Sequence, residues 1–282
     1  MIKLLFCISL LVIIVQAQYL SSGWFLMLLN YQYDQAQDSH GTQKTTLVLI
    51  HGLFGSLSNL GIIAREFQGK FNLLQIDVRN HGHSAHSDEM NYQLMAQDVL
   101  QTLDHLNIEK FIAIGHSMGG KITMKLAGLA QDRMQKMIVL DMTPFAYQEN
   151  HHDQIFKALF AVENAQIESR KEATEIMRQY LKEEMVIQFL LKSFSKGKWL
   201  FNVQALFNHY ADILSWENQQ VNPIPALFIK GGNSPYISKA EHFSAIETQF
   251  SHSQVKVIEQ VGHWLHAEKP AVVNQMISGF IE

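Results

Sequence analysis

The sequence predicts an α/β fold: a mainly parallel, doubly wound sheet with an inserted helical cap. Short apolar runs alternate with segments of helical periodicity, an order typical of parallel strands covered by helices on both faces. The alternation stops over residues 145–222, where helical patterns follow one another without a buried strand. A chain of 282 residues, 47% hydrophobic and 17% charged, can bury the large core that this fold needs.

Buried strands are expected before the interruption wherever apolar and β-branched residues cluster. They are predicted within 24–33 and at 45–50, 72–76, 111–114 and 137–140. Helices are predicted between them, over 60–67, over 92–106, and from a turn at 115–120 to about residue 130. The segment 92–106 repeats apolar residues at helical intervals, which gives that helix one face for the core.

The interruption and the return to the sheet complete the predicted organisation. Cap helices are expected over 153–162, 169–181 and 184–194; the core then resumes with a strand at 226–229, a helix at 238–250, a strand at 255–258 and a helix at 270–280. Pro270 suits the first turn of that last helix, where its missing N–H is no loss. The predicted division is therefore an extension (1–26), a core in two parts (27–144 and 223–282) and a cap (145–222).

Charge and cysteine content exclude several classes of function. The net charge is −4, which argues against nucleic acid or an anionic membrane as the main partner. Stable membrane insertion is not expected either. Cys7 is the single cysteine, which excludes an internal disulfide and a multi-cysteine metal site.

Residues 1–26 allow two interpretations. Lys3 precedes an apolar run over 4–15, and small residues follow at 15–17. This is the form of a secretory signal peptide, and the run is too short to span a bilayer. A signal peptide would make the protein periplasmic or secreted. Translation from Met27 would instead leave it cytoplasmic, and the residues alone leave both open.

A nucleophilic serine is predicted in the stretch Gly115-His116-Ser117-Met118-Gly119. The pattern G-x-S-x-G is short, but here a buried strand precedes it and a helix follows it. Such a turn strains the serine and exposes its hydroxyl beside the positive end of the helix. The alternative is an ordinary glycine-rich turn.

Backbone donors for a developing oxyanion are expected in two loops. Met118 follows the serine directly, and Leu53 lies in the loop His51-Gly52-Leu53-Phe54-Gly55 after an earlier strand. The N–H groups of Leu53 and Met118 are the predicted pair. The alternative is that this loop only shapes a turn.

His263 is the expected general base among 14 histidines, because it follows a buried strand at the same edge of the sheet. His81, His83 and His86 form a cluster and His151 and His152 a pair, either of which could be imagined as metal ligands. Histidine clusters in loops are more often solvated, so neither a metal nor a cofactor is expected.

Asp141 is the expected acid that orients His263. The loop after the strand at 226–229 has no acid near its start: Asn233 and Ser234 stand there, and Glu241, the first acid downstream, is predicted to lie on a helix. Asp141 ends the strand next to the nucleophile strand, and a right-handed crossover brings both strand ends to one edge. The chain order Ser, Asp, His also fits this type of fold. The alternative is that Asp141 caps the turn at 143–144.

Seven stretches carry a resemblance to a known family: HGLFGSLSNLG (51–61), DVRNHGHS (77–84), GHSMGGK (115–121), QIFKAL (154–159), VIQFLLKSF (186–194), GGNSPY (231–236) and GHWLHAEKP (262–270). They resemble the α/β-hydrolase superfamily and, within it, the bacterial YbfF-type esterases. The resemblance implies an α/β-hydrolase fold, hydrolysis of short esters and acyl-CoA thioesters, and an acid at the position of Asp141. It begins near Met27, which favours the cytoplasmic interpretation.

Three functions are compatible with these residues. A serine esterase or thioesterase would form an acyl-enzyme on Ser117, and its partner would be a small ester or thioester. A carbon–carbon bond hydrolase or a lyase could use the same fold, and a non-catalytic binding module is a third class. Ser117, Asp141 and His263 together favour the hydrolase.

Two sets of cap residues bear on the substrate. Aromatic residues expected to line a pocket under the cap are Phe156, Phe160, Phe189 and Phe194. A basic cluster of Lys192, Lys196 and Lys198 could meet the phosphates of coenzyme A, the alternative being a solvated helix end.

Overall fold

The computed structural model describes residues 27–36, 44–149 and 152–282. The predicted signal segment, the first part of the strand expected at 24–33, and His151 lie outside these ranges. The interpretations placed on them stay predictions.

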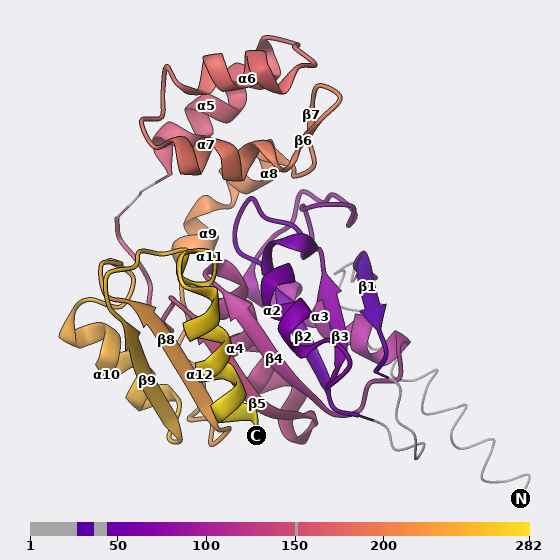
Figure 1. The fold of residues 1–282 in the computed structure, drawn as a ribbon, viewed down its shortest axis with the longest axis vertical. Helices are drawn as coiled ribbons and strands as arrows, with labels where there is room; N and C mark the ends of the chain where they lie inside the picture. Colours follow the sequence, from indigo (N-terminus) through magenta and orange to yellow (C-terminus); the bar gives the residue numbers. More distant parts are fainter. Residues whose placement is uncertain (1–26, 37–43, 150–151) are drawn as a thin grey trace, which may run out of the picture.

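A seven-stranded sheet forms the centre of the molecule (Figure 1). Its strand order is β1-β3-β2-β4-β5-β8-β9. The strands are β1 (Tyr31–Asp34), β2 (Thr46–Ile50), β3 (Asn72–Ile76), β4 (Phe111–His116), β5 (Met134–Leu140), β8 (Ala226–Gly231) and β9 (Ser253–Ile258). β1 pairs antiparallel to β3, and all other pairs are parallel, which confirms the predicted fold class.

Helices cover both faces of the sheet because the strand residues alternate between two apolar clusters. Leu47 and Leu49 of β2 face α2 (Gly61–Phe67) and α12 (Pro270–Ile281). Val48 and Ile50 of the same strand face α3 (Tyr92–His105), α4 (Met118–Ala130) and α10 (Ala240–Gln249). Both sides of each central strand are therefore buried, as a doubly wound sheet requires.

Five helices stand between β5 and β8, beyond the edge of the sheet where β4 and β5 end (Figure 1). They are α5 (Asp153–Asn164), α6 (Arg170–Met177), α7 (Glu184–Leu191), α8 (Val203–Asn208) and α9 (Tyr210–Leu214). The expectation of helices alone is wrong in one detail. A two-stranded hairpin, β6 (Phe194–Ser195) with β7 (Lys198–Trp199), follows α7. Gly197 turns its tip at φ 75°, and Trp199 packs on Phe194 with ring centroids 4.9 Å apart.

Other differences concern the ends of elements. α6 ends at Met177 rather than at residue 181, because Gln179 and Tyr180 donate hydrogen bonds three residues back and tighten the chain into turns. The short helices α8, α9 and α11 (Leu265–Glu268) were not predicted. Within the described ranges, no helix combines the length and the apolar character needed to cross a bilayer.

Candidate active site

Ser117 lies at a sharp turn between β4 and α4, with φ 54° and ψ −122°. A Cβ at Gly115 would lie 2.2 Å from the carbonyl oxygen of Gly119, and one at Gly119 would lie 2.2 Å from that of Ile50. Glycine is therefore required on both sides of the serine. The N–H of Ser117 donates to Leu140 at 3.0 Å, which ties the turn to β5.

Asp141 and His263 are in direct contact. Oδ2 of Asp141 lies 2.7 Å from Nδ1 of His263. Asp141 is fully buried and has φ 52°, so its backbone also leaves the sheet through a left-handed turn. Its carboxylate accepts further hydrogen bonds from the N–H of Gly231 at 2.9 Å and from the hydroxyl of Ser234. Three groups, the Gly231 N–H, the Ser234 hydroxyl and the His263 ring, thus hold this carboxylate in place.

The backbone and ring of His263 are held from several sides. His116 donates from Nε2 to the carbonyl of His263 at 2.9 Å, and Glu268 accepts from the N–H of Gly262 at 3.1 Å. The ring of Tyr236 lies 4.3 Å from the His263 ring at an interplanar angle of 32°. Because Nδ1 faces Asp141, Nε2 is the nitrogen left to exchange a proton.

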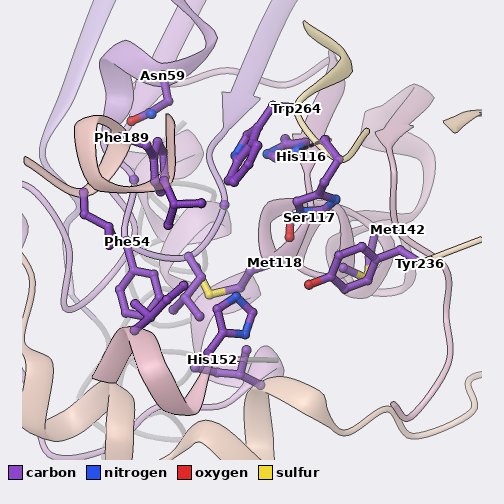
Figure 2. A pocket seen from close by; sticks show the side chains of 18 of the residues that line it. Phe54, Asn59, His116, Ser117, Met118, Met142, His152, Phe189, Tyr236 and Trp264 are labelled. Atoms are coloured by element: carbon purple, nitrogen blue, oxygen red, sulfur yellow. Dashed lines mark hydrogen bonds between the residues drawn. The ribbon is translucent and has the colours of Figure 1, made fainter. Parts of the chain in front are cut away.

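Ser117 and His263 line the same cavity. No hydrogen bond joins Ser117 Oγ to the His263 ring in the described part of the chain. Such contacts are often loose in an empty site and tighten with substrate. Figure 2 shows Ser117 on the cavity wall between Met118 and Tyr236.

The two predicted oxyanion donors reach this cavity. Leu53 and Met118 both line it. Among the described residues, neither backbone N–H has a hydrogen-bond acceptor. Both groups are thus available to an oxygen bound next to Ser117.

The cavity has a volume of about 250 Å³ and lies between the sheet edge and the inserted helices. Besides the residues above, its wall includes Phe54, Tyr92, Lys121, Met142, Tyr147, Met185, Phe189, Lys192, Ile213, Leu214 and Trp264. Most of this wall is apolar or aromatic, which suits a hydrocarbon chain.

The prediction of pocket-lining phenylalanines is correct for Phe189 and wrong for the other three. Phe189 lies on the cavity wall, 5.9 Å from the ring of Trp264. Phe156 packs against Phe54 at 5.5 Å, Phe160 against Phe207 at 5.5 Å, and Phe194 against Trp199. These three stabilise the inserted helices, as aromatic residues at helical spacing usually do.

The histidine clusters have separate environments. His81 is buried and both its ring nitrogens contact backbone groups, whereas His83 and His86 are exposed. His152 contacts the hydroxyl of Tyr210 at 2.5 Å. In residues 27–36, 44–149 and 152–282, no group of three or more His, Cys, Asp or Glu side chains could hold a metal ion.

Buried polar groups around the cavity have shifted pKa values. Burial lowers the pKa of Lys121 to about 7. Burial, with a smaller effect of the Asp141 charge, raises the pKa of Tyr236 to about 12. Burial, helped by His263 and Lys192, lowers the pKa of His266 to about 4. The cavity wall is therefore a dry environment that disfavours unpaired charge.

Comparison with known proteins agrees with this architecture. Residues 45–163 match the family model of the alpha/beta hydrolase fold. A putative esterase/lipase of Haemophilus influenzae is 49% identical over 257 residues, which cover 90% of this chain and 88% of that protein. A solved marine microorganism esterase, 31% identical, matches with a TM-score of 0.83 over 90% of this chain and 99% of its own.

The chain belongs to the α/β-hydrolase superfamily. Within it, the chain is similar to esterase YbfF of Escherichia coli, with 47% identity over 255 residues that cover 90% of this chain and 99% of that protein. The resemblance predicted from the seven sequence stretches is thereby confirmed.

Proposed function

We propose that the protein is a serine hydrolase of carboxylic esters. The observation that carries the proposal is the 2.7 Å contact between Asp141 and His263, a histidine that lines one apolar cavity together with the strained Ser117. This is the arrangement that activates a serine for acyl transfer. The names of two relatives, esterase YbfF and putative esterase/lipase, support the same reaction class.

The reaction proceeds through an acyl-enzyme. Nε2 of His263 takes the proton of Ser117 as Oγ attacks the acyl carbon, and Asp141 stabilises the imidazolium. The oxyanion of the tetrahedral intermediate accepts hydrogen bonds from the N–H groups of Leu53 and Met118. His263 then gives its proton to the leaving alcohol, and water activated by the same nitrogen releases the acid.

The same sequence of steps applies to acyl-CoA thioesters, whose leaving thiol needs less help from a general acid than an alkoxide does. We include them as proposed substrates. Lys192 lies on the cavity wall and is exposed, so it is available to a phosphate at the cavity mouth. Lys196 and Lys198, the other members of the predicted basic cluster, do not line the cavity.

The inserted segment 145–222 serves as the cap in this proposal. Met185, Phe189 and Ile213 come from it and line the cavity together with Ser117. Covering the site excludes water and selects the acyl group by shape.

The replacement Ser117→Ala tests the proposal. We expect hydrolysis of p-nitrophenyl butyrate and of butyryl-CoA to fall by several orders of magnitude, because the nucleophile is removed. Ser278→Ala, in α12 and outside the cavity, is the matched control and should keep full activity. Equal activity of the two variants would overturn the proposed function.

A further inference from the structure

Two buried histidines contact the loop that carries Leu53. His51 and His81 are 1% and 0% exposed, and their rings meet edge to face with centroids 5.2 Å apart. Neither lines the cavity, so neither can touch a substrate there. All four ring nitrogens of these histidines instead contact backbone groups, either of the loop itself or of residues 78–79.

His51 acts on the peptide group that contains the Leu53 N–H. Its Nε2 accepts from the N–H of Val78 at 3.1 Å, so in the neutral ring the proton is on Nδ1. Nδ1 donates to the carbonyl of Gly52 at 2.8 Å. The Gly52 carbonyl and the Leu53 N–H belong to one planar trans peptide and point in opposite directions. Holding that carbonyl therefore sets the direction of the N–H.

His81 acts on the next peptide group. Its Nε2 accepts from the N–H of Phe54 at 3.1 Å, and its Nδ1 donates to the carbonyl of Arg79 at 3.0 Å. Phe54 has φ 62°, a conformation that costs a non-glycine residue energy and persists only where the surroundings impose it. The peptides on both sides of Leu53 thus each contact one imidazole, and the Gly52 carbonyl also accepts from the N–H of Gly55 at 3.1 Å.

The two rings must be neutral to do this, because each uses one nitrogen as an acceptor. Burial lowers the pKa of His81 to about 3 and lowers that of His51 as well. Neither ring becomes protonated near neutral pH, so each keeps one nitrogen able to accept a hydrogen bond.

We infer that His51 and His81 are positioning residues of the oxyanion site: His51 donates a hydrogen bond to one peptide group next to Leu53, His81 accepts one from the other, and together these bonds aim the Leu53 N–H at the developing oxyanion. The inference rests on the proposed serine-hydrolase function. The nitrogen that contacts a peptide group next to Leu53 differs between the two rings. For His51 the important nitrogen is Nδ1, which donates to Gly52, and for His81 it is Nε2, which accepts from Phe54.

Amide side chains can separate these nitrogens. The amide of asparagine lies as many bonds from the backbone as Nδ1, and that of glutamine as many as Nε2. H51N therefore keeps a donor for Gly52, whereas H51Q keeps only an acceptor for Val78. H81Q keeps an acceptor for Phe54, whereas H81N keeps only a donor for Arg79. The retained group is the functional one in H51N and H81Q.

The expected result is a crossed pattern. H51N and H81Q should keep kcat for p-nitrophenyl butyrate within about threefold of wild type. H51Q and H81N should lose about 10- to 100-fold in kcat at nearly unchanged KM, because only transition-state binding is weakened. The inhibition constant of a trifluoromethyl ketone, whose adduct with Ser117 carries an oxyanion, should rise in parallel. Urea unfolding of each variant measures its stability.

Several results would overturn the inference. One is a loss of kcat that follows stability rather than the crossed pattern. Another is a loss carried by KM, and a third is an unchanged trifluoromethyl ketone affinity in H51Q and H81N. If one histidine's variants fail to fold, the pair at the other histidine decides. Failure of the proposed function is distinguishable, because it would appear as full activity of S117A in the wild-type background.

Discussion

Asp141 leaves the sheet from β5, directly beside the strand that ends in Ser117. Leu140 of β5 pairs with His116 of β4, so the two site residues follow paired positions. The usual acid position after β8 is filled by Asn233, which is exposed, and Ser234, which is buried. Ser234 donates to Asp141 rather than replacing it. The loop after β8 therefore contacts the Asp141 carboxylate through Gly231 and Ser234.

Replacing Asp141 by asparagine should lower kcat by about 10⁴, the loss seen when a triad acid becomes an amide in a serine protease. The amide cannot stabilise an imidazolium, and it favours the wrong tautomer of His263. Steady-state kinetics with p-nitrophenyl butyrate measure the effect. The controls are Asn233→Ala and Glu241→Gln, both of exposed side chains, which should keep activity. Loss of activity in either control with retention in the asparagine variant would contradict the assignment.

The sequence predicts which site residues lie at the sheet edge better than it predicts what supports them. Ser117 and Asp141 follow from strand order, because parallel strands end at one edge. The contributions of Ser234 and of the His51 ring could not be predicted. They depend on loop conformations, such as the left-handed backbone at Phe54 and Asp141, that no periodicity specifies. A buried histidine in a loop is a signal worth testing, but its sequence position does not reveal its tautomer.

Helix α4 is joined to the end of α9 by Lys121. Its ammonium donates to the carbonyls of Leu214 and Ser215, both at 2.9 Å, and it lies over the rings of Tyr92 at 5.4 Å and Tyr147 at 4.9 Å. The carbonyls at a helix end carry partial negative charge, which favours a cation there. Lys121 thereby connects the helix that begins at the nucleophile to the last helix of the inserted segment.

Lys121 should make stability depend on pH. Its pKa is lowered to about 7 from 10.5, so between these values the unfolded chain binds more protons than the folded one. Folding stability then rises with pH in this window. We expect the free energy of unfolding of wild type, minus that of Lys121→Met, to rise by about 2 kcal/mol from pH 7 to pH 9.

Urea unfolding at the two pH values checks this expectation. The pKa values of Tyr92 and Tyr147, the titratable groups facing Lys121, are raised by burial, so neither titrates below pH 9. A difference that stays constant between pH 7 and pH 9 would show that Lys121 is charged throughout.

The elements divide into those predicted from the sequence and those that tertiary contacts create. β2, β3 and β4 are buried along their whole length, so each is a mostly apolar run that can be predicted from the sequence. The five-residue helix α9 is too short to be stable alone and depends on contacts such as those of Lys121. The two-residue strands of the hairpin after α7 are equally short.

The stretch 77–84 joins distant parts of the molecule. Asp77 accepts from Asn30 at 2.7 Å and from the N–H of Leu57 at 2.7 Å, and the buried Arg79 forms an ion pair with Asp98 of α3 at 2.6 Å. The carbonyl of Asn80 accepts from Asn202 of the inserted segment at 2.9 Å. With the bond from the Phe54 N–H to His81, the stretch connects the residue before β1, α3, the Leu53 loop and the inserted segment.

Lys192 is an exposed residue on the wall of the cavity that Ser117 and His263 line. Lys192 directly follows α7 in the sequence. An acyl chain directed at the apolar wall would leave the phosphates of coenzyme A outside the cavity. Lys192 is then the member of the basic cluster that they can reach, whereas Lys198 lies in the hairpin and off the cavity wall.

Charge reversal separates these two lysines. Lys192→Glu should raise KM for butyryl-CoA by about threefold to tenfold, the range for exposed charge contacts that change from attraction to repulsion. KM for p-nitrophenyl butyrate should not change, because that ester carries no phosphate. Lys198→Glu makes the same change in net charge and should leave both constants at the wild-type value. The effect of Lys192→Glu should also shrink at high salt, since exposed charges are screened there. Equal shifts in the two variants, or equal shifts for the two substrates, would mean that net charge rather than a contact at the cavity mouth governs binding.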